Sequence, residues 1–113
     1  MSEHPIDLSS RIIDTGAFEQ PNRVTNELSE LADGVALVES FSHSVAVECG
    51  EGLVVFDTSG VFTGRAVTKA LRGWSTDPVH TVVYTHGHAD HVGGSGALLA
   101  EGRTRGHADP RVV

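Results

Sequence analysis

Alternating apolar and polar positions dominate the chain from residue 26 to residue 57. Alternation with a period of two is typical of strands that bury one face. It recurs in four short segments, residues 27–31, 35–39, 44–48 and 53–57. Asp-Gly separates the first pair and Gly-Glu-Gly the second, which predicts two consecutive hairpins. The uninterrupted apolar run at the start of the fourth segment further predicts a strand that is buried on both faces.

A helical period replaces the alternation after residue 61. The apolar positions of residues 62–73 and the tryptophan that follows form one predicted stripe: Phe62, Ala66, Val67, Ala70, Leu71 and Trp74. The basic residues Arg65, Lys69 and Arg72 are then expected to face outward. Residues 80–84 are β-branched and aromatic, as in a buried strand. Strand, helix and strand in this order predict a parallel pair with a right-handed crossover.

The two ends of the chain carry weaker patterns. Residues 1–25 show no sustained period, and we interpret them as a loop or arm outside a domain of residues 26–113. Residues 92–101 predict a short helix that Gly102 ends. Residues 111–113 have the composition of the first residues of another strand.

Composition limits the function classes. The formal charge of −7 and the pI of 5.3, without a compensating Lys or Arg cluster, argue against a nucleic-acid partner. The single cysteine, Cys49, excludes an intramolecular disulfide, and we expect it to be buried in its strand. No apolar run is long enough to span a membrane, and the start of the chain lacks signal-peptide character. These features predict a soluble cytoplasmic protein without a membrane partner.

Three histidines and an aspartate crowd into six residues of the stretch YTHGHADHVGG, residues 84–94. Imidazole and carboxylate are the groups that bind zinc or a similar divalent ion at neutral pH. His86 and His88 lie two residues apart in an extended segment, so we predict that they bind one ion from the same side. Asp90 and His91 precede Gly-Gly and a predicted helix, and we place them at or just before its N-terminus, facing the same pocket. This arrangement suggests a second metal position.

Asp57 ends the strand that should lie beside residues 84–94, which we call the metal loop. The carboxyl edge of an open α/β sheet is where such folds place their sites. We favour a carboxylate that hydrogen-bonds the loop or a ligating imidazole. The alternative is a helix cap that Asp57 shares with Thr58 and Ser59. His107 repeats part of the cluster in residues 106–109 but lacks its partners, so we do not assign it to a metal.

The HxHxDH motif after an apolar strand and before Gly-Gly resembles the metallo-β-lactamase superfamily. The resemblance covers about residues 26–101 and rests on His86, His88, Asp90, His91, Gly93, Gly94 and the strand ending in Asp57. It implies an α/β (α+β) fold, the N-terminal half of an αββα sandwich, since the family's domain is roughly twice as long. It also makes His43 a candidate for the edge of the substrate pocket.

The resemblance implies a zinc-dependent hydrolase with one or two Zn²⁺ ions and a small-molecule substrate. In that family metal-bound hydroxide attacks an ester, thioester, lactone or sulfate ester, with Asp90 orienting the nucleophile. The upstream sequence is loosely similar to the alkyl-sulfatase branch. Two alternatives stay open: an inactive metal-binding fragment without the downstream ligands, and an iron-dependent redox member of the fold. Because half of the sandwich is missing, we expect self-association or a complementing fragment.

Overall fold

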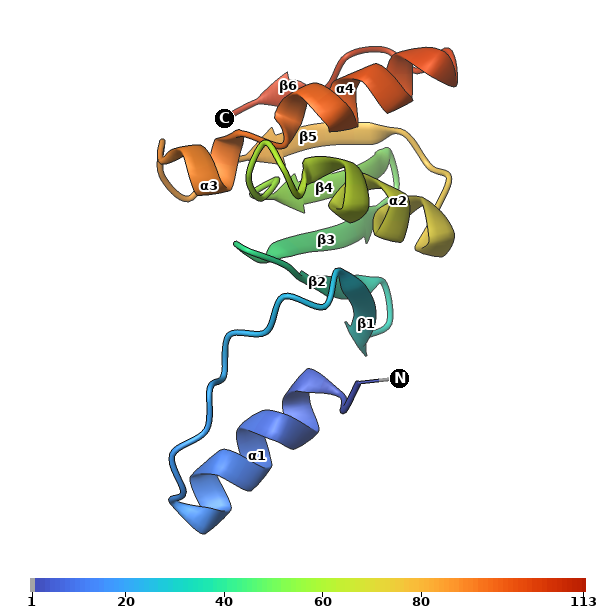
Figure 1. Cartoon of the computed structure of the whole chain (residues 1–113). Coiled ribbons are helices and arrows are strands. Elements are labelled where there is room, and N and C mark those ends of the chain that lie inside the picture. Colours follow the sequence, from blue (N-terminus) through green and yellow to red (C-terminus); the bar gives the residue numbers. More distant parts are fainter. Residues whose placement is uncertain (1) are drawn as a thin grey trace.

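The computed structural model describes residues 2–113, which form one six-stranded sheet with helices packed on it (Figure 1). The strands lie in sequence order, β1-β2-β3-β4-β5-β6. The elements are α1 (Pro5–Thr15), β1 (Glu27–Ala32), β2 (Val35–Glu39), β3 (Ser44–Cys49), β4 (Gly52–Phe56), α2 (Gly64–Trp74), β5 (Val79–Val83), α3 (Ala89–Val92), α4 (Ser95–Thr104) and β6 (Arg111–Val112). Within residues 2–113 no helix is long and apolar enough to cross a membrane.

Both predicted hairpins and the parallel unit are confirmed. β1 to β4 pair antiparallel in succession, and Gly34 takes the left-handed conformation (φ 71°) that the first turn requires. β4 then pairs parallel with β5, and β5 pairs parallel with β6. The mixed sheet with helices confirms the predicted α/β fold class.

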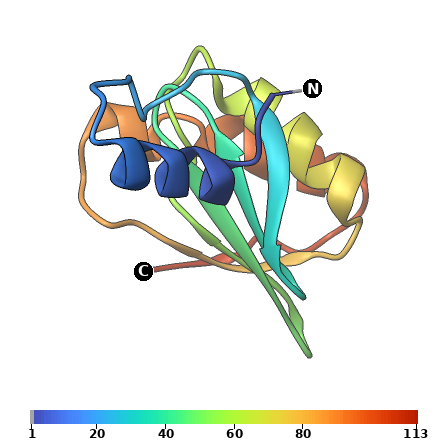
Figure 2. The same cartoon turned by 90° about the horizontal axis from the view of Figure 1, so that it is seen from below.

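The core lies between one face of the sheet and two helices, α2 and α4 (Figures 1 and 2). It consists of Val38, Ala46, Leu53, Val55, Val67, Leu71, Val79, Val82 and Leu98. Arg72 faces this contact between the helices, where its Nε donates to Glu101 Oε1 at 2.7 Å. Its side chain is only 8% exposed. The prediction that Arg72 faces outward is therefore wrong, because α4 packs against that side of α2.

The second face of the sheet is only partly covered. Leu53 and Val55 of β4 are fully buried beneath the helices, whereas Val54 is half-buried and Phe56 is exposed. The prediction that β4 is buried on both faces is wrong in this respect, because α2 and α4 share one face. Cys49 lies at the exposed end of β3, so the prediction that it is buried is also wrong.

Residues 5–15 form a helix, so the prediction of a loop or arm throughout residues 1–25 is wrong there. Pro5 occupies the first turn, the His4 side chain accepts from the Ile6 amide, and Gly16 ends the helix with φ 63°. These end signals mark the helix that the sequence analysis did not predict. The helix α1 lies beyond the β1 edge of the sheet (Figure 1). The boundary between an arm and a domain at residue 26 stays a prediction.

Two helices form from Ala89 onward in place of the one predicted. The short α3 contains Asp90 and His91, and α4 continues through Gly102 to Thr104, so the predicted stop at Gly102 is wrong. Arg105 donates to Glu101 four residues earlier, which supports this last turn across the glycine.

Close backbone packing at Gly94 joins the metal loop to the start of α2. A Cβ at Gly94 would overlap the Thr58 carbonyl oxygen and lie 2.9 Å from Gly64 Cα. We expect Gly94→Ala to lower the free energy of unfolding by about 2 kcal/mol, because the backbone would have to move apart. Urea unfolding measures this change. Gly96→Ala is the control, since nothing lies within 4 Å of its added Cβ; an equal loss from both variants would contradict the packing argument.

Candidate metal centre

Asp57 lies at the carboxyl end of β4 in a left-handed conformation (φ 61°). Its carboxylate is held by the residue after the neighbouring strand: the Thr85 amide donates to Oδ1 at 2.8 Å and Thr85 Oγ1 donates to Oδ2 at 2.7 Å. Ser44 Oγ donates to the Asp57 carbonyl at 2.7 Å. The parallel pairing of β4 with β5 thus brings Asp57 to the metal loop.

The pKa of the Asp57 carboxyl reflects two opposing effects. Burial raises this pKa, but hydrogen bonds from Thr85 and His91 outweigh burial, so the pKa lies below its ordinary value. Asp57 is therefore ionised at neutral pH and can only accept hydrogen bonds.

The His91 imidazole is oriented by that carboxylate. His91 Nδ1 lies 2.7 Å from Asp57 Oδ2, so Nδ1 carries the proton and donates it. In the neutral ring the Nε2 atom then carries the lone pair, with Ser42 Oγ at 3.2 Å and Asp90 Oδ2 at 3.3 Å. The Thr58 amide donates to the His91 carbonyl at 2.8 Å and fixes its backbone. Two roles were considered for Asp57, a helix cap and a carboxylate that hydrogen-bonds the loop or an imidazole. Its hydrogen bonds with Thr85 and His91 are those of the second role.

Three of the four predicted ligands meet in one group. His86, Asp90 and His91 each offer a ligand atom, and these atoms all lie within 4.8 Å of one another. The centres of the His86 and His91 rings lie 4.0 Å apart, with the ring planes tilted by 50°. His88 lies outside this group, with its ring edge-on to His86 at 4.5 Å. The geometry therefore groups His86 with Asp90 and His91, where the sequence suggested one pair for each ion.

The donor set fits a divalent metal ion. Two imidazoles and one carboxylate are an established zinc ligand set, and the same set suits iron(II) with open positions. All three side chains lie on the loop and on α3, with solvent access on one side. An ion bound there would keep free positions for water and substrate.

A cavity of about 500 Å³ opens beside this group. Its lining consists of Asn22, Phe41, Ser42, His43, Val45, Phe56, Asp57, Thr85, Asp90 and His91. His43 is thus placed at the edge of the candidate pocket, with its Nδ1 accepting from the Ser40 amide at 3.2 Å. His107 lies elsewhere, in a small cavity beyond α4.

Two site residues escaped the sequence analysis. Thr85 holds the Asp57 carboxylate, and Ser42 Oγ lies 3.1 Å from His91 Nδ1. Thr85 directly precedes the histidine cluster, and that position is its only sequence signal. Ser42 lies 49 residues before His91, and no local pattern connects them.

Comparisons with known proteins agree with this architecture. The sequence profile of the metallo-beta-lactamase superfamily matches residues 37–111. A linear primary-alkylsulfatase from a Pseudomonas species is 39% identical over 56 residues, 49% of this chain and 11% of that protein. An alkyl/aryl-sulfatase from Saccharomyces cerevisiae is 31% identical over 80 residues, 66% of this chain and 12% of that protein. A ribonuclease Z from Lachnospira eligens is 38% identical over 56 residues, 50% of this chain and 14% of that protein.

Solved structures show the same fold. A metallo-beta-lactamase from Cronobacter sakazakii matches 80% of this chain and 34% of its own with a TM-score of 0.65 at 17% identity. A stereoselective inverting sec-alkylsulfatase from a Pseudomonas species matches 71% of this chain and 13% of its own, with a TM-score of 0.58 at 27% identity. The chain thus spans about a third or less of these proteins.

Proposed function

The chain belongs to the metallo-β-lactamase superfamily. We propose that its side chains bind a divalent metal ion and that the metal site serves the hydrolysis of an ester, thioester, lactone or sulfate ester. The observation that carries the proposal is the meeting of His86, Asp90 and His91 within 4.8 Å. The Asp57 carboxylate supports it, since it holds the His91 proton on Nδ1 and leaves Nε2 unprotonated, as a metal ligand must be.

The proposed mechanism divides the work between the ion and the side chains. When bound, a divalent ion supplies Lewis acidity, which makes a water nucleophilic near pH 7 and offsets charge on the ester oxygen. Asp57 keeps the His91 ring in one tautomer and orientation throughout. Asp90, with its half-exposed carboxylate facing the cavity, orients the attacking water and accepts its proton.

We propose zinc as the ion, with His88 as a fourth ligand from the exposed loop. His88 is exposed and lies edge-on to the His86 ring at 4.5 Å, so it is the imidazole next to the cluster. The same residues also suit an iron(II) centre, the alternative of a redox protein. Metal analysis of the protein as isolated distinguishes zinc from iron.

Two relatives whose names state sulfatase activity favour a sulfate ester as the bond that is cleaved. These two relatives are far longer than this chain. We therefore propose hydrolysis by this chain and keep one alternative, a chain that binds metal but is inactive. Turnover of an aryl sulfate with added zinc, lost with chelator, supports the hydrolase. Zinc binding without turnover supports the alternative.

Metal binding is expected to depend on the cluster and not on the number of histidines. Changing His86 to Ala should weaken zinc binding by roughly 10- to 100-fold, because one imidazole ligand of the cluster is lost. Titration calorimetry with zinc measures the affinity. His107→Ala is the matched control, since His107 lies in a separate cavity and should leave the affinity unchanged. Equal losses from the two variants would refute the ligand assignment.

A further inference from the structure

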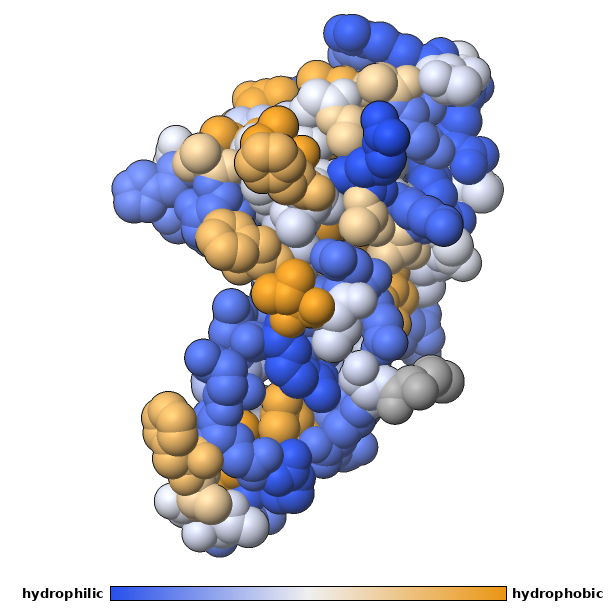
Figure 3. Space-filling model, viewed as in Figure 1, coloured by the Kyte–Doolittle hydropathy of each residue, from blue (hydrophilic) through white to orange (hydrophobic). Residues whose placement is uncertain are grey.

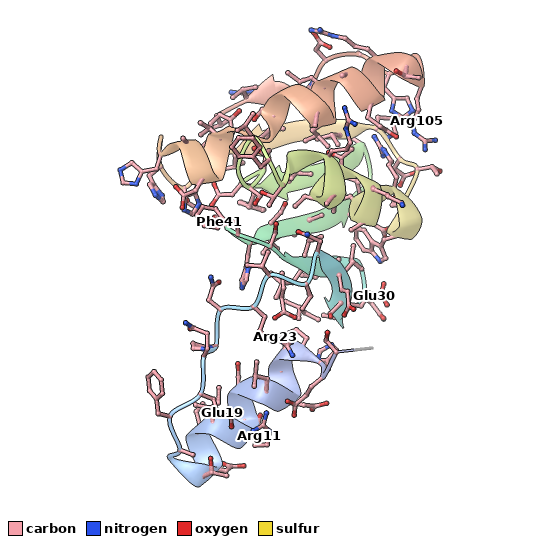
Figure 4. The ribbon with its side chains drawn as sticks, in the orientation of Figure 1. Arg11, Glu19, Arg23, Glu30, Phe41 and Arg105 are labelled. Atoms are coloured by element: carbon pink, nitrogen blue, oxygen red, sulfur yellow. The ribbon has the colours of Figure 1, made fainter. Side chains whose placement is uncertain are left out.

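Four exposed apolar side chains gather beside the metal centre: Val24, Phe41, Val61 and Phe62. They come from three separate segments, the linker before β1, the β2–β3 loop and the β4–α2 loop. With Gly60, Thr63, Ala89, Asp90 and Gly93 they line a cavity of about 640 Å³. Figure 3 shows apolar side chains clustered on this face, and Figure 4 shows Phe41 at its α3 end. We name this cavity the apolar groove.

Phe62 is exposed because of the way α2 begins. The helical period predicted Phe62 in the core stripe, but α2 starts at Gly64, and Phe62 is 98% exposed. A Cβ at Gly64 would overlap Gly94 Cα, so backbone contact fixes the helix start there. The core is closed without Phe62, and its ring lies beside a cavity instead.

The apolar groove continues into the pocket of the metal centre. Phe41 and Asp90 belong to the walls of both cavities. A molecule whose reacting group lies at Asp90 and His91 can therefore extend past Phe41 toward Phe62 without leaving the surface. The groove volume falls within the roughly 300–1,000 Å³ of small-molecule sites.

The chemistry of the walls selects the kind of group that binds. Asp90, at the junction with the metal pocket, is the one charged residue in the groove lining among residues 2–113. Valine and phenylalanine side chains offer no hydrogen bonds, so a charged or strongly polar group would lose its hydration there without compensation. An alkyl or aryl chain instead gains from leaving water.

We propose that the apolar groove binds the uncharged alkyl or aryl chain of the substrate whose ester group lies at the metal centre. This inference rests on the proposed function and adds to it the substrate class, an amphiphilic ester with an anionic or polar head. It also makes Phe62 a residue that determines chain-length preference.

Binding of non-hydrolysable alkyl sulfonates tests the proposal on the full chain. We expect 1-octanesulfonate to bind at least tenfold more tightly than 1-butanesulfonate in calorimetry with added zinc. Burial of one methylene contributes up to about fourfold in affinity, and an open groove gives roughly half of that energy. Phe62→Ser should reduce the ratio of the two affinities to below about threefold.

Phe18→Ser is the matched control, because Phe18 is 97% exposed and lies outside the groove lining. It should leave the octyl-to-butyl ratio unchanged. Equal affinity for both sulfonates in the wild type, or an equal loss of the ratio in both variants, would overturn the proposal.

A chelator separates this inference from the proposed function. If the metal site is wrong and the groove is right, the chain-length ratio and the effect of Phe62→Ser persist with chelator, while zinc changes neither affinity. If zinc raises the affinity for both sulfonates equally and chain length has no effect, the metal site stands and the groove proposal fails.

Sedimentation in the same buffers shows whether a second copy of the chain occupies the groove. Release of a dimer by Phe62→Ser without a change in the ratio of sulfonate affinities would also overturn the proposal.

Discussion

Asp57→Ala is expected to lower the free energy of unfolding by about 4 kcal/mol and to weaken zinc binding by roughly 10- to 100-fold. The substitution removes the acceptor of three hydrogen bonds, from the Thr85 amide, Thr85 Oγ1 and His91 Nδ1. It also places alanine at φ 61°, which costs about 1–2 kcal/mol. Urea unfolding and zinc calorimetry measure the two effects.

Asp57→Asn separates the fold from the site. Asparagine tolerates the left-handed backbone, and its amide oxygen can still accept from the Thr85 amide, so the unfolding free energy should fall by only about 1–2 kcal/mol. Its NH₂ group, however, would face His91 Nδ1 and hold the ring proton on Nε2, where it blocks a metal ion. Zinc affinity should therefore fall as far as in Asp57→Ala.

Asp109→Ala provides the control, because Asp109 pairs with Arg103 on the surface and does not contact the cluster. It should leave zinc affinity unchanged. An Asp57→Asn protein that binds zinc like the wild type would show that Asp57 serves the fold alone.

The isolated chain is expected to self-associate through the partly covered face of β3 and β4. Val45 lies opposite Phe56 in the β3–β4 register, and Val47 lies opposite Val54. Phe56 is exposed and the three valines are half-buried. Covering roughly 400 Å² of apolar surface contributes about 10 kcal/mol, comparable with the whole stability of a small domain. Sedimentation should show a mass above 11.9 kDa that rises with concentration.

Replacing Val45 and Phe56 together by threonine should weaken this association about 100-fold, because each buried apolar side chain contributes roughly 1.5 kcal/mol or more. Threonine retains a high β propensity, so the strands should persist. Ile13→Thr is the control, since Ile13 is exposed on α1, away from these strands. A wild-type chain that stays monomeric at all concentrations and unfolds in one sharp transition would show that this face needs no cover.

Local patterns in the sequence predicted most of the strands. Asp33-Gly34 between two alternating runs led to the first hairpin, because a two-residue turn with a positive φ demands such residues. The apolar runs on either side of α2 led to the parallel pair, because two strands joined by a helix commonly lie parallel in one sheet, with a right-handed crossover. The exception is α1, which the sequence analysis did not predict although Pro5 and Gly16 mark its ends.

The candidate metal-binding cluster was likewise predicted from residue types alone, because clustered imidazoles and a carboxylate are typical of metal binding. The spacing did not show how those residues group. Pairing His86 with His88 followed from the geometry of an extended strand. In the structure the loop turns into α3, and that turn brings Asp90 and His91 back to His86.

The sequence by itself determined the order of the elements, the turns and the position of the histidine cluster, since all of these depend on neighbours within a few residues. Tertiary structure alone decided the contacts between distant segments. Asp57 reaches His91 across 34 residues, and Arg72 turns inward to Glu101 across 29. Phe62 remains in water because Gly64 packs against Gly94. No local pattern records these contacts, because each depends on how strands and helices pack once the sheet has formed.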